Sequence, residues 1–393
     1  MKAWIEHFDR VLDRRRCAEI AARTVDIAIA VQQIPAPTFQ ERARAAYVAG
    51  QFARLGLVDI QTDALDNVYG RLKGRTPDAP GVMIAAHTDT VFSAETNLAI
   101  RREGGTLFGP GLGDNSAGVA GLWALAAYMS EGGITPHRDL WFVATTREEG
   151  LGDLGGMRAA FDQLKGRIAC VINIEGLAFG HVYNAGIAVR RFHITASASG
   201  GHSWLHYGRP SAVHAILALG AKLIEMRPPE HPRTTYNVGM IEGGESINSI
   251  ATRAGLWLDL RSEDSGALSM LEDRVRTSVR ALTISEVQYQ IEVVGDRPAG
   301  ALSIDHPLVV GAMAALEQVG IRGSLESGST DANVPLSLGI PAVTIGVTRG
   351  GNAHRLDEYM ETPPTESGLR QLFLLAQAAA AWTAEKMPQK GSA

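Results

Sequence analysis

Residues 82–90 read VMIAAHTDT: five apolar residues are followed directly by a histidine and, two positions later, by an aspartate. A short, uninterrupted apolar run is typical of a strand that is buried on both faces of a sheet. Three further runs of this form occur at 140–144, 168–172 and 342–347. Because helical segments lie between the runs, the pattern predicts an α/β fold with a mixed, mostly parallel sheet flanked by helices.

Polar residues follow each of the four apolar runs. They are residue types that bind metal ions or carry protons, namely His87 and Asp89, then Glu148 and Glu149, then Glu175, and finally His354 beyond a glycine-rich loop. Ligand sites in open α/β sheets lie outside the carboxyl ends of the strands. We therefore expect these side chains to converge on one site.

Between residues 187 and 294 the pattern of the chain changes. The segments there alternate as strand, helix, strand, strand, helix and strand, at 192–198, 212–226, 236–242, 254–261, 268–282 and 289–294. This order is typical of a ferredoxin-like α+β domain. The run at 342–347 resumes the first domain. We therefore predict one domain from 1–186 and 295–393, interrupted by an insertion at 187–294.

Composition excludes several classes of protein. The 393 residues carry a formal charge of −5, which gives no basic surface for nucleic acid. Cys17 and Cys170 are too few for a disulfide framework or a thiolate metal site. The N-terminal residues lack the apolar core of a signal peptide, and no stretch reaches the roughly 20 apolar residues of a membrane span. We expect a cytoplasmic protein without a membrane partner, beginning with one helix over 4–31.

The spacing of the polar residues indicates their chemistry. His87 and Asp89 point to the same side of an extended segment, so the carboxylate can orient an imidazole that binds a metal ion. Asp114 lies in the glycine-rich stretch 109–118, before an apolar helical segment. It could be a ligand or a helix N-cap, and the loop could cradle phosphate, although it lacks the GxGxxG spacing. Glu148 and Glu149 suit one ligand and one general base, or a solvated turn.

Four short motifs occur in a fixed order along the chain. They are His-Thr-Asp at 87–89, Gly-Asp-Asn at 113–115, Glu-Glu-Gly at 148–150 and Gly-Gly-His-Ser at 200–203. Together they resemble the signatures of the di-zinc peptidase and deacylase family. That family includes glutamate carboxypeptidase, aminoacylase, acetylornithine deacetylase, succinyl-diaminopimelate desuccinylase and peptidase T. The resemblance extends from residue 34 to residue 354.

The resemblance implies two divalent metal ions per subunit, zinc in the family, with cobalt or manganese suited to the same ligand types. The implied ligands are His87, Asp114, Glu149, Glu175 and His354. Asp114 would bridge the two ions, and the peptide bond after this aspartate is often cis in the family. Glu148 would be the general base, and Asp89 would orient His87.

The resemblance also assigns roles in the insertion, which would be a dimerisation and lid domain. His202 would reach into the partner subunit's site and donate to the scissile carbonyl, so that a homodimer is implied. Asn248 and Arg261 match residues that hold a substrate carboxylate, and an arginine can meet a carboxylate with two parallel hydrogen bonds. Arg261 as a surface charge at a strand end stays open as the alternative.

The implied activity is hydrolysis of an amide or peptide bond next to a free carboxylate. The substrate would be a small peptide or an N-acyl amino acid, as for a carboxypeptidase or deacylase, and Glu175, Asn248 and Arg261 favour this branch. The segment 329–361 is more similar to peptidase T, which leaves an aminopeptidase or tripeptidase as an alternative. A metal-binding but inactive relative that works as a binding module is disfavoured, since such a protein has no need of Glu148.

Overall fold

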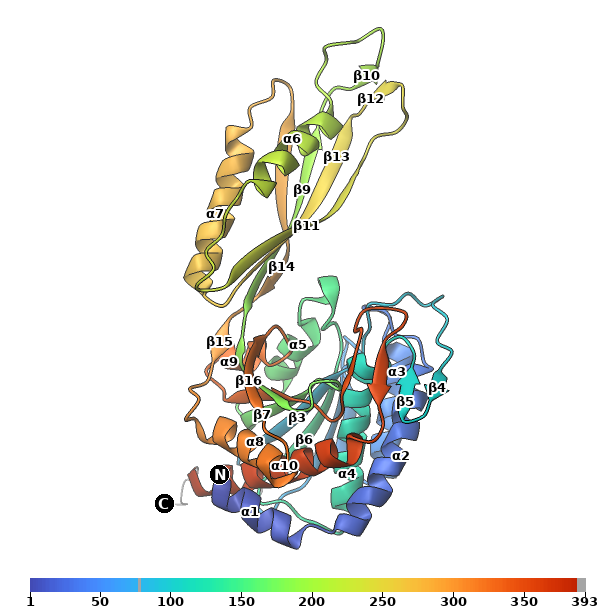
Figure 1. The fold of residues 1–393 in the computed structure, drawn as a ribbon, viewed down its shortest axis with the longest axis vertical. Coiled ribbons are helices and arrows are strands. Elements are labelled where there is room, and N and C mark those ends of the chain that lie inside the picture. The colour runs from blue at the N-terminus through green and yellow to red at the C-terminus, as the bar shows by residue number, and fades with distance from the viewer. Residues whose placement is uncertain (77–78, 387–393) are drawn as a thin grey trace. The chain divides into compact units, whose positions relative to one another are not determined.

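We describe the chain from a computed structural model, which covers residues 1–76 and 79–386. The last residues of the predicted range 295–393 therefore lie outside the described part. The chain divides into two compact units, Met1–Gly186 with Gly300–Ala393, and Ile187–Ala299 (Figure 1). The second unit continues beyond 294 because its last strand, β14 (Gln288–Arg297), passes a bulge after Val293 and keeps pairing.

The first unit is built on a nine-stranded sheet in the order β1-β2-β6-β3-β7-β17-β8-β15, with β16 paired to β8. Its central strands β6 (Leu140–Thr145), β3 (Gly81–His87), β7 (Ile168–Ile174) and β17 (Ala342–Ile345) are parallel and fully buried. The outer strands are β1 (Val58–Thr62), β2 (Val68–Leu72), β8 (His181–Gly186), β15 (Gly300–Ala301) and β16 (Ser324–Gly328). The predicted mixed sheet, parallel at its centre, is confirmed.

Helices cover both faces of this sheet (Figure 1). Alternate residues of β3 separate the two cores: Val82, Ile84 and Ala86 belong to the larger one, and Met83 and Ala85 to the other. The helices of the larger core are α1 (Lys2–Val11), α2 (Arg14–Gln32), α3 (Arg42–Arg54), α4 (Gly118–Glu131), α8 (Pro307–Gln318) and α10 (Thr365–Lys386). The other core is closed by α5 (Gly155–Gln163) and α9 (Asn333–Ser337).

The expected single helix over 4–31 is wrong, because it is two helices. Leu12 has extended backbone angles, and the Asp13 side chain accepts a hydrogen bond from the Arg16 amide, which caps α2. A capping aspartate satisfies an amide that a continuous helix would have bonded to its own backbone. Apolar spacing does not reveal such a break, since both helices present an apolar face to the same core.

A second, small sheet in the first unit joins segments that are far apart in the sequence. Its order is β18-β19-β5-β4, formed by β18 (Gly350–Gly351), β19 (Tyr359–Glu361), β5 (Thr106–Phe108) and β4 (Arg101–Glu103). Tyr359 pairs with Phe108, so the residues before Tyr359 lie next to the residues after Phe108. This pairing brings the glycine-rich loop and the His354 segment together.

The second unit has an antiparallel sheet in the order β11-β13-β9-β14. Its elements follow one another as β9 (Ala188–Ser197), α6 (Ala212–Ile224), β11 (Thr234–Gly243), β13 (Arg253–Ser262), α7 (Ser265–Ala281) and β14. Both helices pack on one face of the sheet, which confirms the ferredoxin-like arrangement. Short strands β10 (Gly201–His202) and β12 (Ser249–Ile250) pair with each other at its margin.

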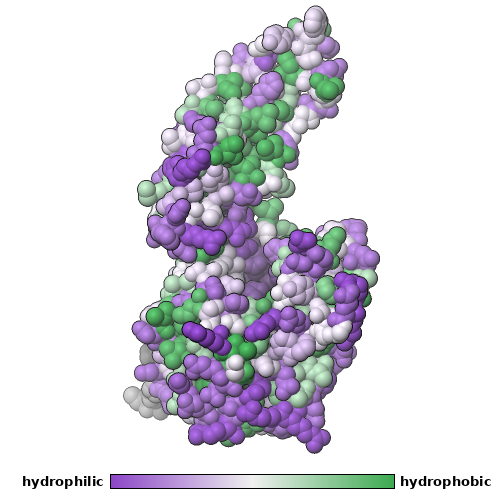
Figure 2. Space-filling model, viewed as in Figure 1, coloured by the Kyte–Doolittle hydropathy of each residue, from purple (hydrophilic) through white to green (hydrophobic). Residues whose placement is uncertain are grey.

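The surface of the second unit carries apolar side chains over α6, seen in green in Figure 2. Leu217 and Ile224 on α6 are more than half exposed, as are Met240 and Ile241 on the edge strand β11. Exposed apolar patches on a stable domain commonly mark a surface that another protein covers. None of the helices in the described ranges is both long and apolar enough to cross a membrane.

Candidate active site

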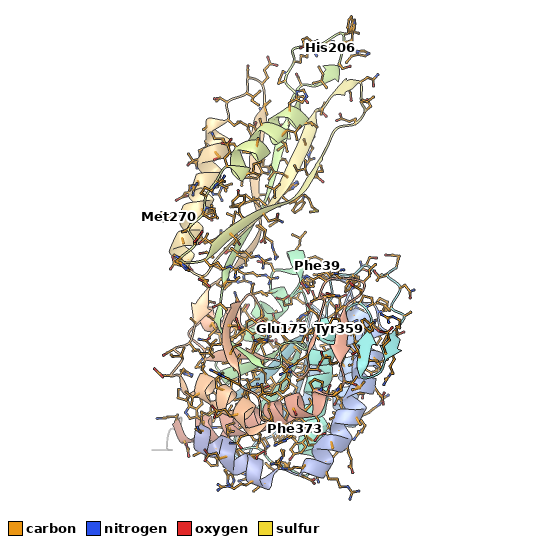
Figure 3. The ribbon with its side chains drawn as sticks, in the orientation of Figure 1. Phe39, Glu175, His206, Met270, Tyr359 and Phe373 are labelled. Atoms are coloured by element: carbon orange, nitrogen blue, oxygen red, sulfur yellow. The ribbon has the colours of Figure 1, made fainter. Side chains whose placement is uncertain are left out.

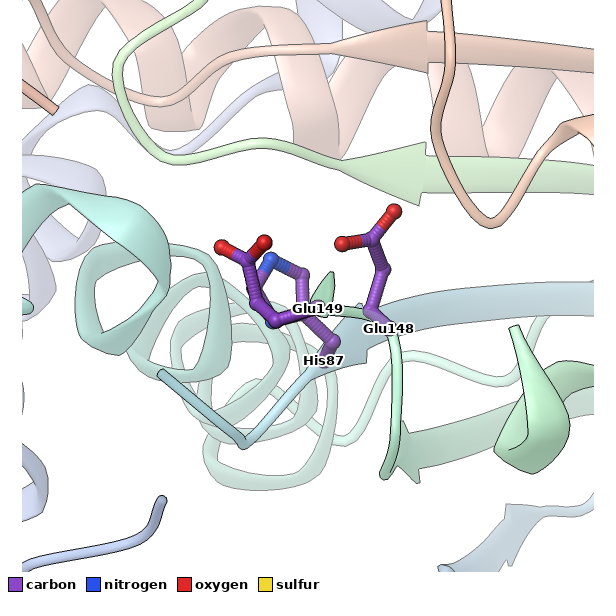
Figure 4. A group of neighbouring side chains, drawn as sticks. All are labelled: His87, Glu148 and Glu149. Atoms are coloured by element: carbon purple, nitrogen blue, oxygen red, sulfur yellow. The ribbon is translucent and has the colours of Figure 1, made fainter. Parts of the chain in front are cut away.

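The polar residues that follow the central strands meet at one edge of the sheet. His87 ends β3, while Glu148 and Glu149 come shortly after β6. Glu175 follows β7 and lies inside the first unit (Figure 3). In Figure 4 the His87 ring and the two glutamate carboxylates project to the same side of the strand ends. Adjacent parallel strands place their carboxyl ends at the same edge, which is why these side chains come together.

Asp114 lies between two imidazoles. Its Oδ1 atom is 3.2 Å from Nε2 of His87, and its Oδ2 atom is 3.2 Å from Nε2 of His354. Glu175 Oε2 lies 3.5 Å from the same His87 nitrogen, and Glu149 Oε1 lies 3.0 Å from the His354 nitrogen. The result is two groups of possible ligands that share one carboxylate: His87, Asp114 and Glu175 on one side, and Asp114, Glu149 and His354 on the other.

Asp89 orients the residues around it. Nδ1 of His87 lies 3.1 Å from the Asp89 carbonyl oxygen and 3.5 Å from its carboxylate, which leaves Nε2 to face Asp114. The backbone amides of Glu148 and Glu149 donate to the two Asp89 carboxylate oxygens, at 3.0 and 2.9 Å. Burial raises the pKa of Asp89, but the hydrogen bond and charge of His87 outweigh it, so the pKa is lowered. Asp89 therefore fixes the histidine mainly through its carbonyl oxygen, and both glutamates through its buried carboxylate.

The neighbour of Asp114 fixes the start of α4. The Asp114–Asn115 peptide bond is cis. Asn115 Oδ1 accepts hydrogen bonds from the Gly118 and Gly176 amides, and its Nδ2 donates to the Ile174 carbonyl. Asn115 thus ties the helix to the end of β7, and the Asp114 carboxylate faces the imidazoles. The alternative of Asp114 as a plain helix cap is therefore wrong.

Glu358 fills the glycine-rich loop. Its carboxylate accepts hydrogen bonds from the backbone amides of Gly111, Gly113 and Asp114, at 3.0, 2.6 and 2.9 Å. The amides that a phosphate cradle would use are thus taken by the chain's own carboxylate. Burial raises the pKa of Glu358 to about 7, against the lowering effect of these donors. The sequence analysis missed this residue, since an acid four positions after His354 carries no recognisable signal.

Another buried acid near the site is Asp331, in the loop that follows β16. Asp331 is fully buried and accepts a hydrogen bond of 2.5 Å from Thr145 Oγ1. Burial raises its pKa to about 7. Thr145 on β6 pairs with His87 on β3. Asp331 therefore binds the residue next to His87 in the sheet.

The charges of the site are unbalanced without a cation. Three carboxylates surround two imidazoles, and the hydrogen bonds that Asp114 and Glu149 accept from His354 raise the pKa of this ring to about 10. The pKa of His87 is also raised, since neighbouring carboxylates outweigh its burial. Burial raises the pKa of Glu175, whereas the two rings lower that of Asp114. The raised pKa values of both rings show that this site favours positive charge, which a divalent cation would also supply.

This donor set fits two divalent cations. Imidazole and carboxylate ligands suit zinc, cobalt and manganese, and a shared carboxylate can bridge ions about 3.5–4 Å apart. Each group of three has its ligand atoms within 4.8 Å of one another. Only His354 is largely exposed; His87 and Glu149 are buried. A third group, His87 with Glu148 and Glu149, also satisfies this distance, and Glu148 is the member that the two Asp114-centred groups leave out.

The remaining predicted site residues lie in the second unit. His202 and Asn248 are neighbours, since His202 pairs with Ser249 and the Ser203 amide donates to the Asn248 carbonyl. Arg261 is at the far end of β13 and donates from Nε to Asp259 at 2.7 Å. The structure thus brings seven of the ten residues together in the first unit, and the other three occupy two ends of the second.

A buried cluster of histidines and carboxylates at the strand ends of a two-unit α/β fold has the ligand types found in metal-dependent hydrolases. Residues 83–380 match the profile of peptidase family M20/M25/M40, so the chain belongs to that family. It is 26% identical over 334 residues to succinyl-diaminopimelate desuccinylase of Corynebacterium glutamicum, covering 83% of this chain and 88% of the relative.

Two further proteins extend the comparison. Carboxypeptidase G2 of a Pseudomonas species is 25% identical over 328 residues, covering 79% of this chain and 76% of the relative. The crystal structure of a tripeptidase from Staphylococcus aureus matches with a TM-score of 0.74 at 20% identity, covering 92% and 99% of the two chains. These relatives differ in their named activities, so the family assignment establishes a hydrolase and leaves its substrate to proposal.

Uptake of metal at pH 8 is expected to release at least one proton per chain. The pKa of His354 is raised from 6.5 to about 10, so the ring carries a proton at pH 8 that a cation must displace, and His87 is shifted in the same direction. Apparent metal affinity should therefore rise with pH and level off near 10. Calorimetric titration in two buffers of different ionisation enthalpy measures the release. His354→Asn should release one proton fewer, and heats independent of the buffer would contradict the expectation.

Proposed function

We propose that this protein hydrolyses an amide or peptide bond next to a free carboxylate, in a small peptide or an N-acyl amino acid. The observation that carries the proposal is the position of Asp114, with each carboxylate oxygen facing a different imidazole. In the proposed site His87, Asp114 and Glu175 would hold one divalent ion, and Asp114, Glu149 and His354 would hold the other. Zinc is the proposed metal.

The two ions, when bound, supply Lewis acidity that polarises the scissile carbonyl and makes water acidic near neutral pH. The chain's own residues handle the proton. Glu148 takes a proton from the attacking water and returns it to the leaving nitrogen. Its backbone amide is anchored by Asp89, which also anchors Glu149, so the base and a ligand keep a fixed relation.

His202 is proposed as a hydrogen-bond donor to the scissile carbonyl of the partner subunit's substrate. Its Nδ1 accepts hydrogen bonds from the Trp204 and Leu205 amides, at 3.1 and 3.4 Å. A ring nitrogen that accepts carries no proton, so the neutral ring carries its proton on Nε2. The local turn thus prepares His202 as an Nε2–H donor. This is the form that stabilisation of a developing oxyanion requires.

A homodimer is the proposed assembly, with a second copy covering part of the second unit. The sheet of the second unit has β11 at one edge, with Met240 and Ile241 exposed on this strand. Helix α6 exposes Leu217 and Ile224. An unpaired edge strand next to apolar surface is a ready surface for a second copy. A cytoplasmic location is proposed with it.

Arg261 and Asn248 are the proposed carboxylate contacts. Asp259 accepts from both Arg261 and Arg191, so Arg261 shares its carboxylate partner with a second guanidinium group. Asn248 Oδ1 accepts from Ser246 Oγ, which orients the amide with Nδ2 as a donor. Both arrangements suit an anionic group of a substrate.

The proposal is tested by metal content and turnover of the purified protein. We expect about two ions per chain, loss of activity on chelation and recovery on metal return. A panel of N-acyl amino acids, dipeptides and tripeptides, each with a free or an amidated carboxyl group, should give turnover that depends on the free carboxylate. Turnover that depends on a free amino group, and not on the carboxylate, would favour the aminopeptidase or tripeptidase alternative.

Arg261→Met is expected to raise KM about 10–100-fold with a smaller change in kcat, since a hydrogen bond to a charged group contributes about 1.5–3 kcal/mol. Steady-state kinetics on the best substrate of the panel measures this. Arg253→Met is a suitable control, because Arg253 is an exposed arginine at the other end of β13. Equal KM values for the wild type and Arg261→Met would exclude the proposed contact.

A further inference from the structure

Glu358 connects two segments that each carry a proposed metal ligand. The pairing of Tyr359 with Phe108 places Glu358 beside Gly109, whose amide donates to the Glu358 carbonyl at 2.9 Å. The glycine-rich loop with Asp114 follows Phe108 on one strand. The segment with His354 precedes Tyr359 on the other strand. Glu358 is therefore at the point where the two segments meet.

Three backbone amides of the glycine-rich loop donate to the Glu358 carboxylate, and two of them belong to glycines. Gly111 has a φ of +70°, and a Cβ at this position would lie 2.9 Å from the Thr90 side chain. A Cβ on Gly113 would lie 2.4 Å from Leu177. The backbone conformation at 111 thus favours glycine, and a side chain at 113 would have to displace Leu177. Successive amides that converge in this way form a concave site for an anion, and here the anion is a side chain of the same chain.

Within this site the fully buried carboxylate of Glu358 accepts three hydrogen bonds. Oε1 accepts from the amides of Gly113 and Asp114, and Oε2 accepts from that of Gly111. The carboxylate thus holds the backbone nitrogen of the residue whose side chain lies between the two imidazoles. Loss of these bonds would leave three backbone amides of the loop without their acceptor, which is unfavourable away from water.

The turn that carries His354 is also held together by its own hydrogen bonds. The Glu358 amide donates to the Arg355 carbonyl at 3.1 Å, and Asn352 Nδ2 donates to Asp357 Oδ2 at 3.1 Å. The turn from 352 to 358 is thus bonded to itself, and His354 is carried on it. Moving Glu358 relative to Asp114 would therefore change the separation of Asp114 and His354.

We propose that Glu358 is a positioning residue that sets the distance between Asp114 and His354, and through it the affinity for the metal pair. The proposal rests on the proposed function in taking Asp114 and His354 as ligands. Glu358 itself need not touch the metal or the substrate, since it acts through the backbone of the loop.

Glu358→Gln tests the proposal. Glutamine keeps one oxygen for the Gly113 and Asp114 amides but turns an NH2 group toward the Gly111 amide, which is also a donor. We expect metal affinity, measured by competition with a chelator, to fall about 10–100-fold, as for other residues that orient ligands. The visible spectrum of bound Co²⁺ should change as well. Glu358→Asp keeps the charge with a shorter reach, and its affinity should lie between those of the wild type and Glu358→Gln.

The matched control is Asp139→Asn. Asp139 is also a buried carboxylate that accepts from a backbone amide, that of Gly74 at 2.7 Å, and it pairs with Arg71. It precedes β6, at the end of that strand opposite to Glu148. We expect this variant to lose stability while it retains wild-type metal affinity and Co²⁺ spectrum, at a temperature where all the variants are folded.

Hydrogen exchange of the metal-free proteins separates this proposal from the proposed function. Amides of residues 109–118 should exchange faster in Glu358→Gln than in the wild type or Asp139→Asn. Unchanged exchange and unchanged affinity in Glu358→Gln would overturn the positioning role, and so would an equal loss of affinity in Asp139→Asn. A wild type that binds no metal would refute the proposed function and the effect on affinity together. The exchange data would still decide whether Glu358 holds the loop.

Discussion

Glu148→Gln is expected to lower kcat about 10²–10⁴-fold while the enzyme keeps its bound metal. Glutamine has nearly the same shape but cannot take a proton from water at neutral pH. The backbone amide of residue 148 would still donate to Asp89, so the strand end should keep its conformation. Steady-state kinetics together with metal analysis of the same sample measures both parts of this expectation.

Glu149→Gln provides the comparison. Glu149 Oε1 lies 3.0 Å from His354 and belongs to one of the two Asp114-centred groups, so this variant should lose metal as well as activity. The metal content of the two variants would then distinguish the roles of the two adjacent glutamates, which the sequence alone does not distinguish. A Glu148→Gln enzyme that retains wild-type kcat would exclude Glu148 as the base.

His202→Asn is expected to lower kcat about 10²–10³-fold, the usual effect of removing a donor to a developing oxyanion. Asparagine is shorter than histidine and cannot reproduce the Nε2–H direction that the Trp204 and Leu205 amides impose on the ring. Metal content should stay at the wild-type value, because every proposed ligand lies in the first unit.

Mixing the two inactive variants tests whether His202 acts across subunits. In a dimer of one Glu148→Gln and one His202→Asn chain, the site with an intact Glu148 would receive an intact His202 from the other chain. Random exchange of subunits should restore about a quarter of wild-type activity, since half of the dimers would hold one complete site of two. Activity that stays at the level of the separate variants after confirmed exchange would contradict the cross-subunit role.

The parts of the fold that local pattern encodes could be read from the sequence. Apolar runs gave the four central strands, because a strand buried on both faces has to be apolar throughout. The order of strands and helices gave the ferredoxin-like unit. Chemistry at the strand ends followed from the same reasoning, since the ends of adjacent parallel strands meet at one edge.

The parts that depend on pairing between distant segments could not be read in this way. The small sheet joins residues near 106 to residues near 359 through strands of two or three residues, too short for any periodicity. Glu358 owes its position to this sheet, so the sequence offered no reason to single it out. The break between α1 and α2 likewise depends on a single side chain, that of Asp13. The continuation of β14 to Arg297 depends on a bulge in the strand.

The contacts of Asp89 limit how the active site of such an enzyme can change during evolution. One residue supports three groups: the Asp89 carbonyl oxygen lies 3.1 Å from the His87 ring, and the Asp89 carboxylate accepts from the backbone amides of two neighbouring acids. A substitution that shifts Asp89 would disturb all of them together, and no compensating change at one position could restore the set. New substrate preferences are therefore expected to arise by changes elsewhere in the chain, around a chemical centre that has to be inherited whole.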